Sequence, residues 1–317
     1  MTTNWKAVAL DAHQKKHAKE TASLQQQLDH ALAQIERLEK SKRAKVIAAS
    51  PTRRKDDGDT ITVCIPDTHG AKIARAEFAA MLADIKALNP QRIILLGDHV
   101  DCGGFLAIHH VMGYVAETSY SYEDDVSAAN AMLDALQAAA PDASIEYIEG
   151  NHERRVETWC VTQTLRHSKD AEGLRKLYAP EFRLHLAERG IPYYRQGAFY
   201  DGIPIPGVIK RGKCYFTHGF KTSKHATADM VDALAGNVVH ADTHRQQSHV
   251  VRRAGTGITG GWCPGCLCEL QPLWQHTNPT TWTLGYGVQL TDSVGDFLHI
   301  NVPVIEGKSL LSALLKL

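Results

Sequence analysis

Five apolar runs of the chain end in residues that could bind metal ions. The first run, 61–66 (ITVCIP), is followed by Asp67, Thr68 and His69. The later runs end in 97–101 (GDHVD), 150–153 (GNHE), 217–219 (THG) and 240–244 (HADTH). In an open α/β sheet, ligands bind in the crevice at the carboxyl ends of the strands. Carboxylate and imidazole groups gathered there would accept Mg²⁺, Mn²⁺, Fe or Zn²⁺ without any thiolate.

The order of these motifs resembles the calcineurin-like metallophosphoesterase superfamily, in particular its stand-alone phage and bacterial members that are described as DNA-repair-exonuclease-like. That family reads D-x-H, G-D-x-x-D, G-N-H-[ED], a lone His before Gly, and G-H-x-H. The first four stand here as DTH, GDHVD, GNHE and HG. The fifth departs from the family, because Ala241-Asp242-Thr243-His244 stands where G-H-x-H is expected.

The resemblance implies a centre of two divalent metal ions. Asp67, His69 and His244 would hold the first metal, and Asp98 would bridge to the second. The second metal would take the ligands Asn151, His218 and Asp242. His240 is the alternative to Asp242, since strand alternation would put both on one side. A carboxylate at this position favours a harder ion such as Mn²⁺, with Fe, Zn²⁺ and Mg²⁺ as alternatives.

The same resemblance implies hydrolysis of a phosphoester by a bridging hydroxide. His152 would protonate the leaving oxygen, and Asp101 would orient His152 as its catalytic partner. Arg154 and Arg155 would bind a phosphate oxygen, or else are solvated at the start of a helix. His99 is either a substrate contact or a surface residue.

The substrate class follows less directly from the residues. In Ser/Thr protein phosphatases an Arg follows the second motif, whereas here Cys102 follows Asp101. We therefore expect a phosphodiesterase or nuclease acting on DNA, RNA or a nucleotide. A phosphomonoesterase acting on proteins or small molecules is the alternative. A catalytically weak scaffold or binding protein on the same fold is an alternative of another class, and Asp242 is the only residue in its favour.

Strand and helix patterns alternate after residue 60, which predicts βαβ units and a largely parallel sheet. The predicted helices are 74–88, 123–140, 154–168 and 171–189. Shorter β-rich runs follow, at 198–200, 207–209, 214–216, 238–239, 249–252, 282–290 and 297–302. We therefore predict an α/β fold, and the resemblance implies two packed mixed β-sheets flanked by helices, a four-layer αββα sandwich.

Three regions are expected along the chain. Residues 1–45 form a helical extension whose heptad seam, within 13–43, indicates either a short coiled coil that joins two copies or docking on the domain. Residues 46–59 form a basic linker, or an arm that holds a nucleic-acid backbone. Residues 60–317 form the metallophosphoesterase domain. Its long loop 102–122 is a candidate wall of the substrate cleft.

Composition limits the cellular context. The formal net charge is zero, so bulk charge does not favour a nucleic acid or an anionic membrane. The chain lacks both an apolar run of transmembrane length and a signal-peptide core, so we expect a cytoplasmic protein without a membrane partner. Seven cysteines, an odd number, do not indicate a secreted disulfide framework. Cys263, Cys266 and Cys268 form a turn with buried thiols, or a structural zinc site with His276.

Overall fold

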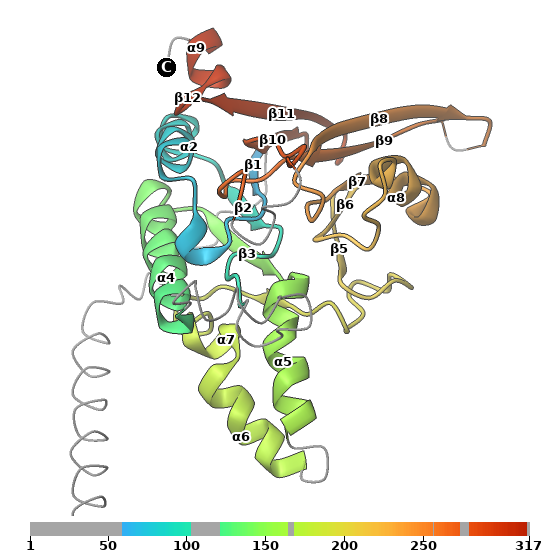
Figure 1. Ribbon diagram of the computed structural model, residues 1–317. Coiled ribbons are helices and arrows are strands. Elements are labelled where there is room, and N and C mark those ends of the chain that lie inside the picture. The colour runs from blue at the N-terminus through green and yellow to red at the C-terminus, as the bar shows by residue number, and fades with distance from the viewer. Residues whose placement is uncertain (1–58, 103–120, 164–167, 256, 273–278, 316–317) are drawn as a thin grey trace, which may run out of the picture. The chain divides into compact units, whose positions relative to one another are not determined.

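Two β-sheets form the centre of the molecule in the computed structural model, which describes residues 59–102, 121–163, 168–255, 257–272 and 279–315 (Figure 1). Several predictions concern residues outside these ranges. They are the helix within 1–45, the linker 46–59 except for its last residue, most of the loop 102–122, and His276. They stay predictions.

The first sheet has seven strands in the order β12-β11-β10-β1-β2-β3-β4. Its parallel half pairs β1 with β2, β2 with β3 and β3 with β4, and its other half is antiparallel. The bounds of its strands are β1 (Thr60–Ile65), β2 (Arg92–Leu95), β3 (Ser144–Ile148), β4 (Tyr193–Tyr194), β10 (Gly285–Thr291), β11 (Phe297–Ile305) and β12 (Lys308–Ser309). The predicted sheet of βαβ units is confirmed for β1, β2 and β3.

The second sheet has five strands in the order β5-β6-β7-β9-β8. Its two central pairs are parallel and its two edge pairs antiparallel, so this sheet is also mixed. The bounds of its strands are β5 (Val208–Arg211), β6 (Cys214–Thr217), β7 (Asn237–Val239), β8 (Gln246–Arg253) and β9 (Gly257–Pro264). Strands β8 and β9 form a long hairpin that extends away from the rest of the sheet (Figure 1).

Side-chain alternation divides the interior into layers. On β1, Val63 and Ile65 pack in the core that includes Met81 and Leu133 of the helices. Cys64 points to the opposite face, where it belongs to a core formed with the second sheet. The far face of the second sheet is covered by α8 (Ala226–Leu234). The predicted helix–sheet–sheet–helix sandwich is therefore confirmed (Figure 1).

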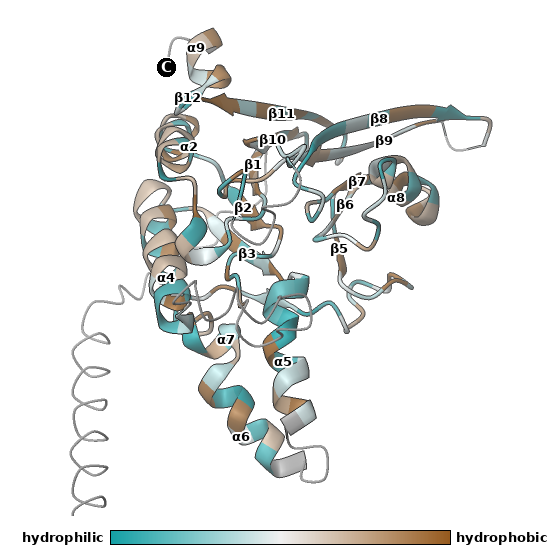
Figure 2. Ribbon diagram, viewed as in Figure 1, coloured by the Kyte–Doolittle hydropathy of each residue, from teal (hydrophilic) through white to brown (hydrophobic). Residues whose placement is uncertain are grey.

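Helices beside the first sheet pack against it and form a core with its strands. Their bounds are η1 (Gly70–Lys72), α2 (Arg75–Leu88), α4 (Tyr122–Ala139), α5 (Asn151–Gln163), α6 (Ser168–Tyr178) and α7 (Pro180–Arg183), and a last helix, α9 (Leu310–Leu315), ends the described chain. Figure 2 shows a hydrophilic beginning of α5, next to the carboxyl end of β3. None of the described helices combines the length and the apolar character that a membrane span requires.

Some element predictions were wrong. The predicted helix 171–189 is interrupted before Pro180, because proline lacks an N–H and disfavours helical backbone in the preceding residue. Helix α5 begins at Asn151, three residues before the predicted start, so Asn151 and His152 lie in its first turn. The predicted strand 198–200 is not a strand: a bend at residue 198 is followed by irregular backbone. Strand β9 and helix α8 were not predicted.

Candidate metal centre

Five strand ends deliver the predicted ligands to one place between the two sheets. Asp67 follows β1, Asp98 follows β2 and Asn151 follows β3. His218 follows β6, and the segment 240–244 follows β7. Because β1, β2 and β3 run parallel, their carboxyl ends meet at the same edge of the first sheet. These side chains therefore converge at the carboxyl ends of the strands, as the sequence predicts.

Four of the predicted ligands lie in sharp turns of the backbone. His69, Asp98, Asp242 and His244 all have left-handed backbone, with φ of 52°, 54°, 67° and 56°. Left-handed backbone is unfavourable for residues with a Cβ, and such residues cluster at functional sites. Gly150 allows a close approach, because a Cβ there would lie 2.0 Å from Asp98 Oδ1.

The predicted ligands of the first metal face one another. Nε2 of His244 lies 3.1 Å from Asp67 Oδ2 and 3.3 Å from Nε2 of His69. All three side chains are buried. Burial by itself lowers the pKa of His244, but the Asp67 carboxylate outweighs it and raises that pKa to about 9. A bound cation would take the place of this proton between the two groups.

The predicted ligands of the second metal form a neighbouring group. His218 donates from Nδ1 to the carbonyl of Leu96 at 2.9 Å, which leaves Nε2 as the coordinating atom. That Nε2 lies 2.8 Å from Asn151 Oδ1, 3.3 Å from Asp98 Oδ2 and 3.6 Å from Asp242 Oδ1. The amide of Asn151 also fits in the opposite orientation, in which its nitrogen donates to Asp98 and Asp242 at 3.3 and 3.2 Å.

Asp242, and not His240, is the residue of the fifth motif that faces this group. His240 is fully buried on the other side, with Nε2 2.7 Å from Thr227 Oγ1 of α8 and Nδ1 2.9 Å from the carbonyl of Ala241. The expected strand alternation does not apply, since β7 ends at Val239 and Asp242 is left-handed. The geometry therefore favours Asp242 between the two alternatives.

Asp98 lies between the two groups. A carboxylate oxygen of Asp98 lies within 4.8 Å of potential ligand atoms of Asp67 and His218. Asp98 is also in a second group, in which its oxygen lies within 4.8 Å of ring nitrogens of His69 and His152. Burial would raise its pKa, but the imidazoles of His152 and His218 hold it well below its usual range. Asp98 is therefore an ionised carboxylate within reach of ligand atoms of both groups, as a bridging ligand requires.

His152 and Asp101 adjoin the same cluster. The Nδ1 of His152 lies 2.5 Å from the backbone carbonyl of Asp101 and 3.4 Å from its Oδ1. Oδ1 is closer to Nδ1 of His69, at 3.0 Å. The carboxylate of Asp101 thus contacts a predicted metal ligand as well as the predicted acid. Arg155 also reaches this point, with Nη1 3.0 Å from His152 Nδ1.

One predicted substrate contact, His99, lies in the interior, and the role of Arg154 stays a prediction. His99 is fully buried, with Nδ1 3.0 Å from Thr68 Oγ1 and its ring edge-on to Tyr147. Burial lowers its pKa to about 3, so it is a neutral interior residue in a position that no substrate would reach. Arg154 is exposed on α5, whereas Arg155 is half-buried and faces the centre. We retain Arg155 and exclude His99.

Glu153 has a role that the sequence analysis did not assign. Its carboxylate accepts hydrogen bonds from the backbone N–H groups of Asp98, His99, Val100 and Gly150 at 2.7–3.2 Å. It also accepts one from the hydroxyl of Tyr147 at 2.7 Å. Glu153 therefore fixes the loop that carries Asp98 against the loop that carries Asn151. The sequence signal for this role was the position of Glu153 as the last residue of the third motif.

The three cysteines of 263–268 do not form a site of their own in the described residues. The Cys263 thiol contacts Thr243 Oγ1 at 3.4 Å, and Cys266 lies 3.6 Å from the carbonyl of Thr283. Cys268 shares a side-chain hydrogen bond with Cys266 and also lies beside His69 and His244. A site with His276 involves a residue outside the described ranges.

Comparisons with known proteins give the family of the chain and a set of similar structures. The profile of the calcineurin-like phosphoesterase family matches residues 62–288. Solved structures that are similar include vacuolar protein sorting 29 from Cryptosporidium parvum, at 12% identity and a TM-score of 0.38 over 80% of this chain and 95% of that one. YfcE, a phosphoesterase from E. coli, has 14% identity and a TM-score of 0.34 over 76% and 98% of the two chains. The nuclease MPE of Pseudomonas putida has 11% identity and a TM-score of 0.30 over 75% and 87%. No curated protein matches the sequence.

Proposed function

The chain belongs to the calcineurin-like phosphoesterase family, and we propose that it hydrolyses phosphodiesters in nucleic acids or nucleotides at a centre of two divalent metal ions. The proposed ligands are Asp67, His69 and His244 for one ion and Asn151, His218 and Asp242 for the other, with Asp98 between them. The position of Asp98, 3.3 Å from His218 and within 4.8 Å of ligand atoms of Asp67 and His69, is the observation that carries the proposal.

The donor atoms fit such ions. In one amide orientation, the oxygens of Asn151, Asp98 and Asp242 converge on the Nε2 of His218 within 3.6 Å. Acceptor atoms gathered this closely repel one another unless a proton or a cation lies between them. When bound, two divalent ions would generate a nucleophile from water and neutralise charge on the phosphoryl group.

Residues of the chain around these ligands support an anionic substrate. Arg155 places a guanidinium beside His152, where it would bind a phosphate oxygen. Lys221 and Lys224 are exposed in the segment that follows His218. His152 is held by Asp101 at the edge of the ligand cluster, so we assign it the donation of a proton to the leaving oxygen.

The test is hydrolysis of bis-p-nitrophenyl phosphate against p-nitrophenyl phosphate, with Mn²⁺ added to protein stripped of metal. We expect turnover of the diester that is lost in Asp98→Asn and kept in Asp142→Asn, a control that removes an exposed carboxylate before β3. Single-stranded DNA, RNA and cyclic nucleotides would then identify the natural class of diester.

Other outcomes would select the alternatives. Turnover of the monoester alone would indicate a phosphomonoesterase. A protein that binds neither Mn²⁺ nor Zn²⁺ and hydrolyses neither compound would be a scaffold on the phosphoesterase fold, and the proposal would be wrong.

A further inference from the structure

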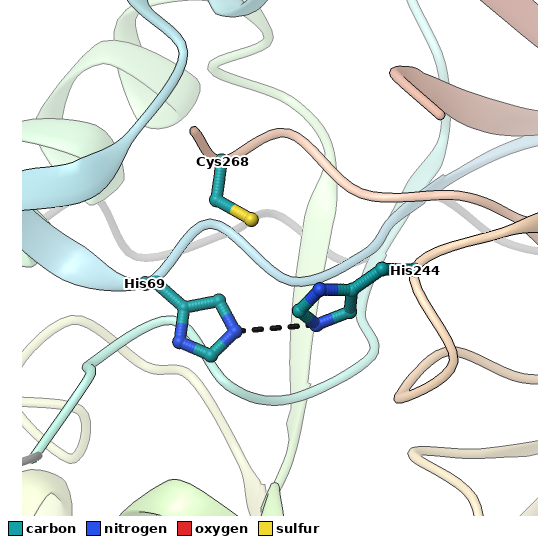
Figure 3. A group of neighbouring side chains, drawn as sticks. All are labelled: His69, His244 and Cys268. Atoms are coloured by element: carbon teal, nitrogen blue, oxygen red, sulfur yellow. Dashed lines mark hydrogen bonds between the residues drawn. The ribbon is translucent and has the colours of Figure 1, made fainter. Parts of the chain in front are cut away.

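Cys268 lies beside two of the proposed ligands of the first metal (Figure 3). The sulfur of Cys268 and ligand nitrogens of His69 and His244 all lie within 4.8 Å of one another. All three residues are buried, and Figure 3 shows the thiol directed toward the two imidazole rings. The three side chains come from segments that are almost 200 residues apart at the extremes, so this is a tertiary arrangement rather than a local turn.

The backbone holds Cys268 in this position. The N–H of Leu267 donates to the carbonyl of Asp67 at 2.8 Å, and the N–H of Ala74 donates to the carbonyl of Leu267 at 2.8 Å. The N–H of Glu269 donates to the carbonyl of Lys72 at 2.9 Å. Hydrogen bonds on both sides of Cys268 thus join its segment to the turn that carries Asp67 and His69.

The spacing of the neighbouring ligand atoms would suit a bound metal ion. Two imidazole nitrogens that bind one Zn²⁺ at its usual bond length lie about 3.3 Å apart. The Nε2 atoms of His69 and His244 are separated by 3.3 Å, and Asp67 Oδ2 lies 3.1 Å from the Nε2 of His244. Asp98 would reach this ion from the side of the second group. Among the described residues, the potential ligand that groups with both His69 and His244 is the Cys268 sulfur, so Cys268 would add a ligand to those already proposed.

We propose that Cys268 is a ligand of the first metal. It would bind as thiolate, so loading of the metal releases the thiol proton to solvent. This inference rests on the proposed metal centre and adds a ligand to it. The consequence concerns metal choice, because a soft sulfur donor selects Zn²⁺ or Fe²⁺ over Mn²⁺. The second group offers oxygen from Asp98, Asn151 and Asp242 with one imidazole, so the two halves of the centre would prefer different ions.

Cys263 provides the matched control. It is a buried thiol five residues before Cys268. Its sulfur lies 3.4 Å from Thr243 Oγ1 and 3.9 Å from the carbonyl oxygen of Ala241. Replacing Cys263 by Ser removes one sulfur from the same segment and leaves the grouping of His69, His244 and Cys268 intact.

The experiment is titration of the full chain, stripped of metal, with Co²⁺. A thiolate ligand produces sulfur-to-cobalt charge-transfer absorption in the near ultraviolet, which oxygen and imidazole ligands do not. We expect this absorption in the wild type and in Cys263→Ser, and its loss in Cys268→Ser. Cys268→Asp supplies an oxygen ligand in the same place, so it should bind the same number of Co²⁺ ions as the wild type without the absorption.

The outcomes separate this inference from the proposed function. Co²⁺ binding by the folded wild type without charge-transfer absorption would exclude Cys268 as a ligand and leave the two-metal centre standing. Absorption that persists in Cys268→Ser or in Cys268→Asp would also exclude it. A wild type that binds no Co²⁺ at all would overturn the proposed centre together with this inference. Absence of the absorption in the wild type is decisive by itself. Its presence is assigned to Cys268 by the variants, and Cys268→Asp provides that assignment if Cys268→Ser does not fold.

Discussion

Asp101 Oδ1 lies 3.0 Å from Nδ1 of His69, closer than it lies to His152. A histidine that coordinates metal through one ring nitrogen usually donates the other N–H to a carboxylate, which fixes its orientation and raises its basicity. Asp101 is placed to do this for His69, whose Nε2 faces His244. At the proposed metal centre, the predicted partner of the catalytic acid would therefore also position a ligand of the first metal.

Asp101→Asn should weaken binding of the first metal. The amide keeps the shape of the side chain but lacks the charge that stabilises the donated N–H. We expect affinity for this ion to fall about 10–100-fold, the usual effect of losing such a partner. Competition between the protein and a chromogenic chelator for Zn²⁺ would measure it. Unchanged affinity, with turnover lowered, would restrict Asp101 to the role of orienting His152.

Asp242→Asn should weaken binding of the second metal, whereas His240→Gln should not. Asn tolerates the left-handed backbone at φ 67°, so the substitution removes charge without adding strain. His240 is bonded to Thr227 and points away from His218. Counting the bound Mn²⁺ ions by equilibrium dialysis at limiting metal would separate the two. Loss of an ion in His240→Gln alone would show that His240 turns in and ligates.

Glu153→Gln should destabilise the fold more than Tyr147→Phe does. Oε1 and Oε2 of Glu153 accept three and two hydrogen bonds, and an amide nitrogen at either position would face donors. At least two buried donors would lose their acceptor, at about 1–3 kcal/mol each. Tyr147→Phe removes one of the five donors and should cost less. Urea denaturation of both variants would compare the two, and an equal cost would contradict this account.

Local pattern was sufficient to predict the strand ends that deliver the ligands. The runs of β1, β2 and β3 are apolar and short, and each stops at a residue that could coordinate metal. The periodicity of α2 and α4 also gave their bounds to within one residue. These features depend on neighbours in the sequence, which is why they could be recognised without the fold.

Other features depend on tertiary contacts that no local pattern contains. Strand β9 is rich in glycine, and Gly261 is required because a Cβ there would lie 2.6 Å from Val231 of α8. In a regular strand, the side chains of His240 and Asp242 would lie on the same side. The left-handed backbone after β7 places them on opposite sides. Cys268 looked like part of a local cysteine motif, and only the pairing of its segment with 67–74 places it beside His69.

His299→Phe should flatten the dependence of stability on pH. Burial lowers the pKa of His299 to about 3, so it stays neutral in the folded chain while the unfolded chain takes up a proton below about 6.5. Its contribution is therefore present above pH 6.5 and is lost as the pH falls toward 3. The free energy of unfolding of the wild type, relative to the variant, should drop by up to about 1.4 kcal/mol per pH unit in this window. Parallel curves for the two proteins would mean that His299 does not titrate between the two states.

His152→Ala should lower turnover without removing metal. Its imidazole is held by Asp101 at the edge of the ligand cluster, where it would protonate the leaving oxygen, and losing such a proton donor costs about 10²–10⁴-fold. The loss should be large for a dinucleotide, whose leaving alkoxide needs the proton, and smaller for bis-p-nitrophenyl phosphate, whose leaving phenolate does not. His249→Ala, which removes a half-buried imidazole on β8 outside the predicted site, is the control. Equal losses on both substrates would exclude proton donation, and loss of a bound ion in His152→Ala would make His152 a ligand instead.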